Sequence, residues 1–170
     1  LFFHEPTMRE HNIRLMNAGK ELKVKRIVAG ECGHGWRTWR MFSETINGPL
    51  PFPVIHLFEE MLEHYRKGRI QFDKSKNPEI VTYHDPCNYA RGGDLIKQPR
   101  ELLRACVQNF VEMEPTAQYS YCCGGGSGIL MDEAMDLRMA LGKPKAESVR
   151  KAKAQILCAP CAICKAQLPA

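Results

Sequence analysis

Cysteines follow the predicted strands of this sequence, and that placement limits the folds open to it. Short runs of β-branched residues alternate with amphipathic segments, as in VKRIVAG at 24–30 and EIVTYHD at 79–85. Such alternation predicts parallel strands joined by right-handed helical crossovers. Because ligand sites of open α/β sheets lie beyond the carboxyl ends of the strands, we expect four groups of thiols to meet at one edge. The cysteines concerned are Cys32, Cys87, the pair Cys122 and Cys123, and the pair Cys158 and Cys161.

The same patterns predict the individual elements of an α/β fold. We expect strands over 24–30, 53–57, 79–85 and 154–157, with 117–121 leading into the adjacent cysteines. We expect helices over 35–46, 58–67, 128–141 and 147–154, and one opened by Pro99 that extends to Phe110. Cys106 lies on the apolar face of that last helix, which predicts a buried core thiol. The methionines of 128–141 are expected in the core.

Eight cysteines are many for a 170-residue chain of otherwise ordinary composition. The opening LFFHEPTMREH is too short and too polar for a signal peptide, and the patterns are those of a well-packed domain. We therefore expect the protein to reside in a reducing compartment. Clustered cysteines in such a compartment are metal ligands or catalytic thiols more often than disulfides. We expect this chain to be a part of a longer protein. We do not expect this part to insert into the membrane, since no apolar run approaches about 20 residues. The scattered net charge of +5 predicts no nucleic-acid partner.

Cys122 and Cys123 stand directly ahead of Gly124, Gly125 and Gly126. Adjacent residues of an extended chain point to opposite sides, but glycines permit positive φ and a close approach of the backbone. Two neighbouring thiolates could then bind different metal atoms of one extended cluster. The backbone N–H groups of the glycines would meet its sulfides, so we expect all three glycines to help bind the cofactor.

The last three cysteines form two overlapping CxxC motifs, Cys158 to Cys161 and Cys161 to Cys164. A CxxC at the start of a helix can hold two thiolates on one metal or cluster, where the helix N-terminus stabilises their charge. Iron or zinc cations remove the electrostatic cost of gathering several thiolates. The register of the motif stays open, with Cys158 as an alternative ligand.

The full spacing C-(34)-CCG-(37)-CxxC, with HDPC on its first cysteine, resembles the cysteine-rich CCG domain. This domain occurs in one of the subunits of heterodisulfide reductase and in the relatives of that subunit, and the resemblance covers residues 81–168. It implies an iron–sulfur cluster of the 4Fe–4S type, in a cubane or non-cubane form, that also handles a disulfide substrate. Cys122 and Cys123 would then take part in catalysis. The implied ligands are Cys87, Cys122, Cys123, Cys161 and Cys164.

Members of this family usually carry two such motifs, and this chain has one complete motif. The segment VAGECGHGW at 28–36 resembles a degenerate C-terminal end of the first motif, in which Cys32 is retained. We therefore expect Rossmann-like parallel sheets in two pseudo-repeated halves, a degenerate one over 1–78 and a complete one over 79–170. The cluster would lie at the C-terminal ends of the strands. Three roles stay open for Cys32: an additional ligand, a thiol that faces the substrate, or a remnant of the first motif without a function.

A single complete motif with ECGHGWR upstream is similar to the heterodisulfide-reductase-like catalytic subunit of a membrane complex associated with sulfite reductase. That similarity implies a cytoplasmic oxidoreductase held at the inner face of the membrane by partners, including a quinone- or haem-binding subunit. It implies ferredoxin-type clusters in the preceding part of the protein. The implied substrate is a small protein whose cysteines form a disulfide or trisulfide. With one cluster site, the two-cluster mechanism of the full reductase does not transfer intact.

Three further possibilities follow from the residues. His84, next to Asp85 at a strand end, could relay protons to a leaving thiolate or could only shape the Cys87 loop by a hydrogen bond. An electron-transfer subunit of a flavin-linked glycolate or lactate oxidase would also carry a CCG domain. A zinc-binding structural module needs only four ligands, which leaves the adjacent cysteine pair unexplained.

Overall fold

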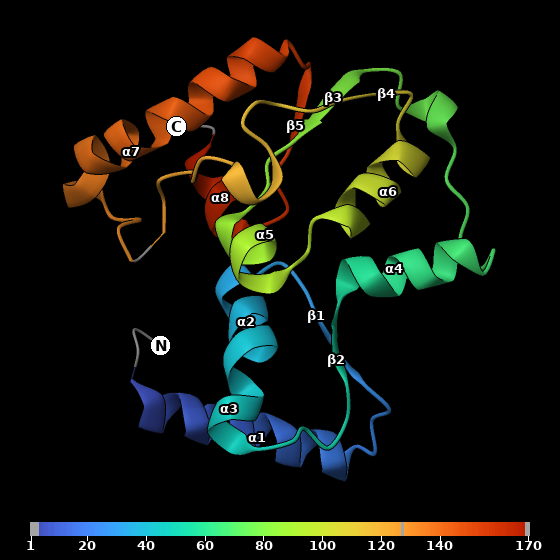
Figure 1. Cartoon of the computed structure of the whole chain (residues 1–170), viewed down its shortest axis with the longest axis vertical. Coiled ribbons are helices and arrows are strands. Elements are labelled where there is room, and N and C mark those ends of the chain that lie inside the picture. Colours follow the sequence, from blue (N-terminus) through green and yellow to red (C-terminus); the bar gives the residue numbers. More distant parts are fainter. Residues whose placement is uncertain (1–3, 127, 169–170) are drawn as a thin grey trace.

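Two small parallel sheets with helices packed around them form the computed structural model, which describes residues 4–126 and 128–168 (Figure 1). One sheet pairs β1 (Ile27–Ala29) with β2 (Val54–His56). The other has the order β4 (Asn109–Val111), β3 (Ile80–Tyr83), β5 (Ile156–Cys158). All neighbouring strands are parallel, which confirms the α/β class and puts the carboxyl ends of β3, β4 and β5 at one edge.

Helices of the first part surround the two-stranded sheet. α1 (Glu5–Glu21), which is not among the predicted elements, begins with Pro6 in its first turn, where a missing N–H costs nothing. α2 (Gly33–Arg37) continues through a π-helical turn at Thr38–Phe42 into α3 (Ser43–Asn47), in agreement with the helix predicted over 35–46. β2 leads directly into α4 (Leu57–Arg66).

Helices of the second part connect the strands of the three-stranded sheet. α5 (Cys87–Gly93) follows β3, and α6 (Lys97–Cys106) leads to β4. α7 (Met135–Ala152) precedes β5, and α8 (Ala162–Gln167) follows it. Among the described helices, none combines the length and the apolar character that a membrane-spanning segment requires.

α6 is displaced from the prediction. It begins before Pro99, at Lys97, and ends at Cys106, so Phe110 lies in β4 opposite Val81 and not on a helix. The backbone of 109–111 pairs with the edge of β3, and α6 therefore does not continue to Phe110 as predicted. Cys106 is accordingly the last residue of the helix and only half-buried, which corrects the expectation of a buried core thiol.

One helix, α7, replaces the two predicted over 128–141 and 147–154, and Pro144 lies inside it. Polar side chains form its buried face, namely those of Arg138, Lys145 and Ser148. Ser148 donates to the carbonyl of Glu114, 2.7 Å away. The expectation that the methionines of this region belong to the core is wrong, because α7 is anchored through its polar face. The exposed methionines are Met131, Met135 and Met139.

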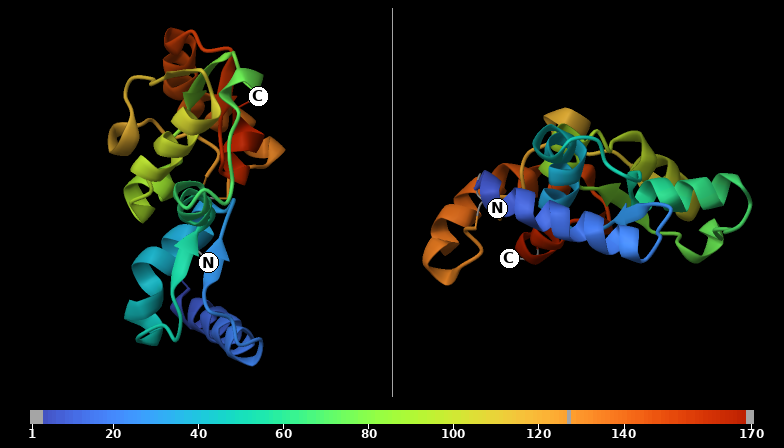
Figure 2. Two further views of the ribbon diagram at one scale, coloured as in Figure 1. Left: turned by 90° about the vertical axis from the view of Figure 1, so that its right-hand side faces the viewer. Right: turned by 90° about the horizontal axis from the view of Figure 1, so that it is seen from below.

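The two parts of the chain meet where α2 packs against α5 and α4 against α6. Figure 2 shows the resulting elongated shape, with α1 and the two-stranded sheet at one end and the three-stranded sheet at the other. The indole N–H of Trp36 donates to the carbonyl of Gly93, 3.1 Å away, across this junction. A Cβ on Gly93 would lie 2.2 Å from that indole nitrogen, so only glycine fits there. Tyr89, fully buried, packs edge-on against the ring of His56.

Candidate metal centre

Five cysteines line one small pocket beyond the carboxyl ends of β3 and β5. Cys87 opens α5 shortly after the end of β3, and Cys161 is the N-cap residue of α8 shortly after the end of β5. The Cβ-free backbone of Gly126 and the side chains of His34, Pro86, Asn88 and Ile163 complete the described lining. None of these described lining residues carries a carboxylate. The five thiols are those of Cys87, Cys122, Cys123, Cys161 and Cys164.

The adjacent pair reaches the pocket by a route that the sequence does not predict. The segment before it is not a strand, since residues 117–119 form a 3-10 turn and the strand β4 ends at Val111. Cys122 and Cys123 therefore come from a long connection after β4, and only Cys87, Cys161 and Cys164 arrive within a few residues of a strand end. The expectation that the pair directly follows a strand is wrong, because the pairing edge of β3 is taken by 109–111.

Interactions between the thiols form a continuous series from Cys87 through Cys122, Cys123 and Cys164 to Cys161. Hydrogen bonds from Cys123, the larger cause, and from Cys87 lower the pKa of Cys122 to about 2. Hydrogen bonding from Cys164 lowers the pKa of Cys161 to about 5. The other three thiols show the opposite effect: Cys122 raises the pKa of Cys87 and of Cys123, and Cys123 raises that of Cys164. Cys122 and Cys161 therefore ionise at the expense of the thiols next to them, and a bound cation removes this conflict.

Backbone N–H groups also point at the sulfur atoms. The N–H of Gly124 lies 3.4 Å from Sγ of Cys122, and that of Gly125 bonds to the Cys123 thiolate. Cys161 receives backbone hydrogen bonds from Cys164, Gly33 and Ile163, which contribute to its lowered pKa. Donors of this kind stabilise thiolates and tune clusters that thiolates hold.

The three glycines after the pair occupy different surroundings. Gly124 has φ +88°, and a Cβ there would lie 2.7 Å from the backbone nitrogen of Gly142 on α7. A Cβ on Gly125 would lie 2.9 Å from Cβ of Gln167 on α8. Gly126 alone lines the pocket, and no described atom lies within 4 Å of a Cβ built on it. Two glycines thus permit close packing behind the cysteine pair, and the third leaves open space beside it.

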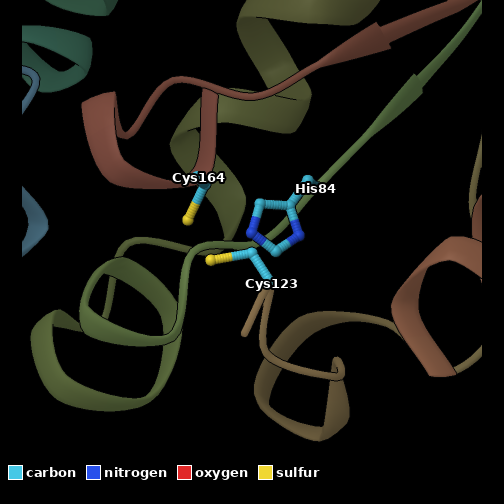
Figure 3. Close-up of side chains that lie close together, drawn as sticks. All are labelled: His84, Cys123 and Cys164. Carbon is cyan, nitrogen blue, oxygen red and sulfur yellow. The ribbon is translucent and has the colours of Figure 1, made fainter. Parts of the chain in front are cut away.

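His84 reaches the same cluster of thiols from the end of β3. One of its ring nitrogens and the sulfur atoms of Cys123 and Cys164 all lie within 4.8 Å of one another. Figure 3 shows these three side chains close together. The side chain is fully buried, and neither ring nitrogen has a hydrogen-bond partner among the described residues. Burial lowers the pKa of His84 to about 3, so the imidazole is neutral near pH 7. A buried polar group without a partner indicates that a further group belongs in this space.

Asp85 does not pair with His84. Its carboxylate accepts two hydrogen bonds of 2.8 Å from Arg100 and one of 2.9 Å from the N–H of Ala117. Arg100 also contacts Glu112, so this buried network holds the connection from β4 to the cysteine pair against β3. The sequence contains no local signal for the network, because its members are brought together only by the sheet.

Cys32 and Cys158 stay outside the described pocket lining. Cys158 ends β5, and its carbonyl accepts from the N–H of His84. Cys32 is exposed and caps α2, with its sulfur 3.3 Å from the N–H of Gly35. The neighbouring Glu31 accepts from the N–H of Ala162, so the first part of the chain nevertheless borders the last CxxC.

The donor set fits an iron–sulfur cluster. Thiolates are soft ligands that favour iron–sulfur clusters, zinc or Cu(I) over hard cations, and carboxylates are missing from the described lining. Five thiols exceed the four that a tetrahedral zinc ion takes. A cluster with its own sulfides would also use the N–H donors that point at the sulfur atoms. The open space beside Gly126 would leave room for it.

Known proteins resemble this chain over nearly its whole length. An Hdr-like menaquinol oxidoreductase iron–sulfur subunit 2 of Archaeoglobus fulgidus is 37% identical over 93% of the chain and 36% of its own length. One subunit of the dihydromethanophenazine:CoB–CoM heterodisulfide reductase of Methanosarcina barkeri is 32% identical over 95% of the chain and 38% of its own length.

A subunit of the fumarate reductase (CoM/CoB) of Methanothermobacter marburgensis matches half of the chain at 38% identity and 17% of its own length. This chain thus spans little more than a third of the length of the Archaeoglobus and Methanosarcina relatives. The family model of the CCG cysteine-rich domain matches residues 81–169, from β3 to the last residues. The chain therefore belongs to the cysteine-rich CCG domain family.

Proposed function

We propose that this chain holds one iron–sulfur cluster and forms the disulfide-handling part of a heterodisulfide-reductase-like oxidoreductase. The observation that carries the proposal is the convergence of five thiols on one pocket lined without a described carboxylate. The names of the relatives, an Hdr-like iron–sulfur subunit and a heterodisulfide reductase, support it. The proposed ligands are Cys87, Cys122, Cys123, Cys161 and Cys164.

The cluster, when bound, would supply electrons one at a time and a metal site with affinity for substrate sulfur. The overall conversion would be a disulfide plus two electrons and two protons giving two thiols, or its reverse, with partner subunits exchanging the electrons. The buried Cys123, Cys161 and Cys164 would exclude water on one side, and the open space at Gly126 would admit a substrate sulfur. His84, neutral and buried, would orient groups at Cys123 and Cys164.

The wider setting is part of the same proposal. We propose other redox subunits, including a quinone- or haem-binding membrane subunit, and a small protein with a disulfide or trisulfide as substrate, in sulfite or sulfate metabolism. The proposed place is the cytoplasm, at the inner face of the membrane. The menaquinol oxidoreductase named among the relatives supports a quinone-linked partner. Ferredoxin-type clusters would lie in a part of the protein outside this chain.

We also propose that residues 1–78 and 79–170 are two halves of CCG type, of which the first has lost its cysteine set. The separate parallel sheets, β1–β2 and β4–β3–β5, support this division. In the first half only Cys32 remains, at the place where a strand end meets α2.

Metal analysis of the anaerobically purified whole protein tests the proposal. Iron and acid-labile sulfide are expected, whereas stoichiometric zinc without sulfide would establish the zinc module. The electron paramagnetic resonance signal of the oxidised protein is then recorded with and without a reduced dithiol protein. A changed signal supports disulfide chemistry. An unchanged signal at saturating dithiol would favour an electron-transfer role of the kind found in hydroxyacid oxidases.

A further inference from the structure

Lys145 is a fully buried residue close to the segment that carries the cysteine pair. It comes from α7 and is 0% exposed. Its ammonium donates to Oγ of Ser120, 2.7 Å away, and to Sδ of Met113, 3.2 Å away. Ser120 lies two residues before Cys122, so the charge sits beside the segment that delivers the adjacent thiols.

Neither partner of this ammonium is charged. A buried ammonium that has only a hydroxyl and a thioether as partners is costly, since burial of a charge is tolerated when an opposite charge offsets it. In the described part of the chain the hydrogen bonds of the Lys145 ammonium go to Ser120 and Met113, and neither acceptor is a carboxylate. Asp85, the acid that interacts with it at longer range, already accepts hydrogen bonds from Arg100 and Ala117.

Two cysteines of the pocket lie close enough to Lys145 to act on its charge. Burial lowers the pKa of Lys145 to about 8, and attraction to Asp85, Cys164 and Cys122 acts against that decrease. Two of these three groups are thiols that line the pocket. Another cation, Arg91, donates to the carbonyl of Ser120, but its side chain belongs to an exposed residue, where water screens its charge. Because Lys145 is fully buried, its charge acts on the thiols through a low dielectric.

We propose that Lys145 is the buried counter-charge of the iron–sulfur site, a positioning residue that raises the reduction potential of the bound cluster. The inference rests on the proposed function, because it requires a cluster in the pocket. Adding an electron makes the cluster and its thiolates more negative, and a nearby buried positive charge stabilises that state more than the oxidised one. The hydroxyl of Ser120 holds the ammonium at its place.

Redox titration of the holoprotein followed by electron paramagnetic resonance tests this inference. Lys145→Met and Lys145→Gln remove the charge, and Gln keeps a donor for Ser120. At the midpoint potential of the unaltered protein, we expect each variant to raise the ratio of oxidised to reduced cluster about tenfold, which for a one-electron couple is a potential ~59 mV lower. Lys145→Arg keeps the charge and should stay near the unaltered value. Lys143→Met, at an exposed position of the same helix, is the matched control and should change nothing.

The outcomes separate this inference from the proposed function. Full iron content and an unchanged potential in Lys145→Met or Lys145→Gln would overturn it. Loss of iron from both neutral variants but not from Lys145→Arg supports it, because charge is the property that Arg shares. Loss of iron from all three variants overturns it, since packing alone would then explain the residue. Absence of a cluster from the unaltered protein refutes the proposed function and not only the role of Lys145.

Discussion

Arg100 and Asp85 form a bidentate ion pair at the strand end that leads into Cys87, with both N–O distances 2.8 Å. The Asp85 side chain is 0% exposed and that of Arg100 is 10% exposed, so water contributes little to solvating either charge. The pair ties β3, through Asp85, to α6. It therefore holds the strand end that carries His84 and Cys87.

Replacement of Arg100 by Met should lower the free energy of unfolding by roughly 3–5 kcal/mol, because it leaves the Asp85 carboxylate buried without its counter-ion. Urea denaturation at pH 7 measures the effect. Arg104→Met is the control: its contact with Glu112 is 3.8 Å long and its side chain 62% exposed, so a change below about 1 kcal/mol is expected. Equal effects of the two substitutions would contradict the structural importance of the buried pair.

Replacement of Cys122 or Cys123 by Ser should remove the cluster or alter its type, since both thiols line the pocket. Iron and sulfide content and the visible absorption spectrum measure the outcome. Cys106→Ala should keep the spectrum, because Cys106 ends α6 outside the described lining. Iron loss from the Cys106 variant, with retention in the Cys123 variant, would show the ligand assignment to be wrong.

The two overlapping CxxC motifs can be told apart in the same way. Cys164→Ser should release iron, whereas Cys158→Ser should retain it, because Cys164 lines the pocket and Cys158 does not. Burial raises the pKa of Cys158, which makes its thiolate less available as a ligand. The reverse pattern of iron content would place the motif in the Cys158 to Cys161 register.

Gly126→Val should weaken the effect of an added dithiol on the electron paramagnetic resonance signal while iron content stays nearly constant. The new side chain would enter the open space beside the thiols, where no described atom lies within 4 Å of the added Cβ. Gly125→Val is the contrasting variant. Its Cβ would lie 2.9 Å from Cβ of Gln167, so it should destabilise the fold by about 1–3 kcal/mol. An unaltered dithiol response in Gly126→Val would mean that substrate sulfur enters elsewhere.

The pH dependence of stability should depend on His56. Burial lowers the pKa of His56 to about 4, and its Nδ1 accepts from the N–H of Phe58 at the start of α4. The unfolded chain binds a proton near pH 6.5 and the folded chain does not, so this contribution is full above pH 6.5 and is lost as the pH falls toward 4. Between pH 7 and 5.5 the loss should be about 1 kcal/mol.

His56→Asn provides the comparison, because Asn is a good N-cap residue that does not titrate. Urea denaturation at both pH values should show a smaller decrease for the variant than for the unaltered protein, by about 1 kcal/mol. The same decrease in both proteins would show that His56 does not titrate between the folded and the unfolded state as expected.

Local patterns in the sequence determined the family, the α/β class and most of the strands. The runs around β1, β2, β3 and β5 are β-branched and bounded by glycine, proline or cysteine, so each element is specified within its own few residues. The spacing of HDPC, CCG and CxxC likewise needs no tertiary information. These signals are local, and they survive in a sequence taken alone.

Only the tertiary structure decided the features that depend on partners distant in the chain. The free edge of β3 pairs with 109–111, and so α6 ends early and the cysteine pair arrives from a loop. The sheet brings Arg100 to Asp85 and leaves His84 facing the thiols, although Asp85 is its neighbour in sequence. α7 carries Lys145 inward because hydrogen bonds to Ser120 and Met113 replace water there. The free energy of such contacts comes from residues tens of positions apart, which no local periodicity records.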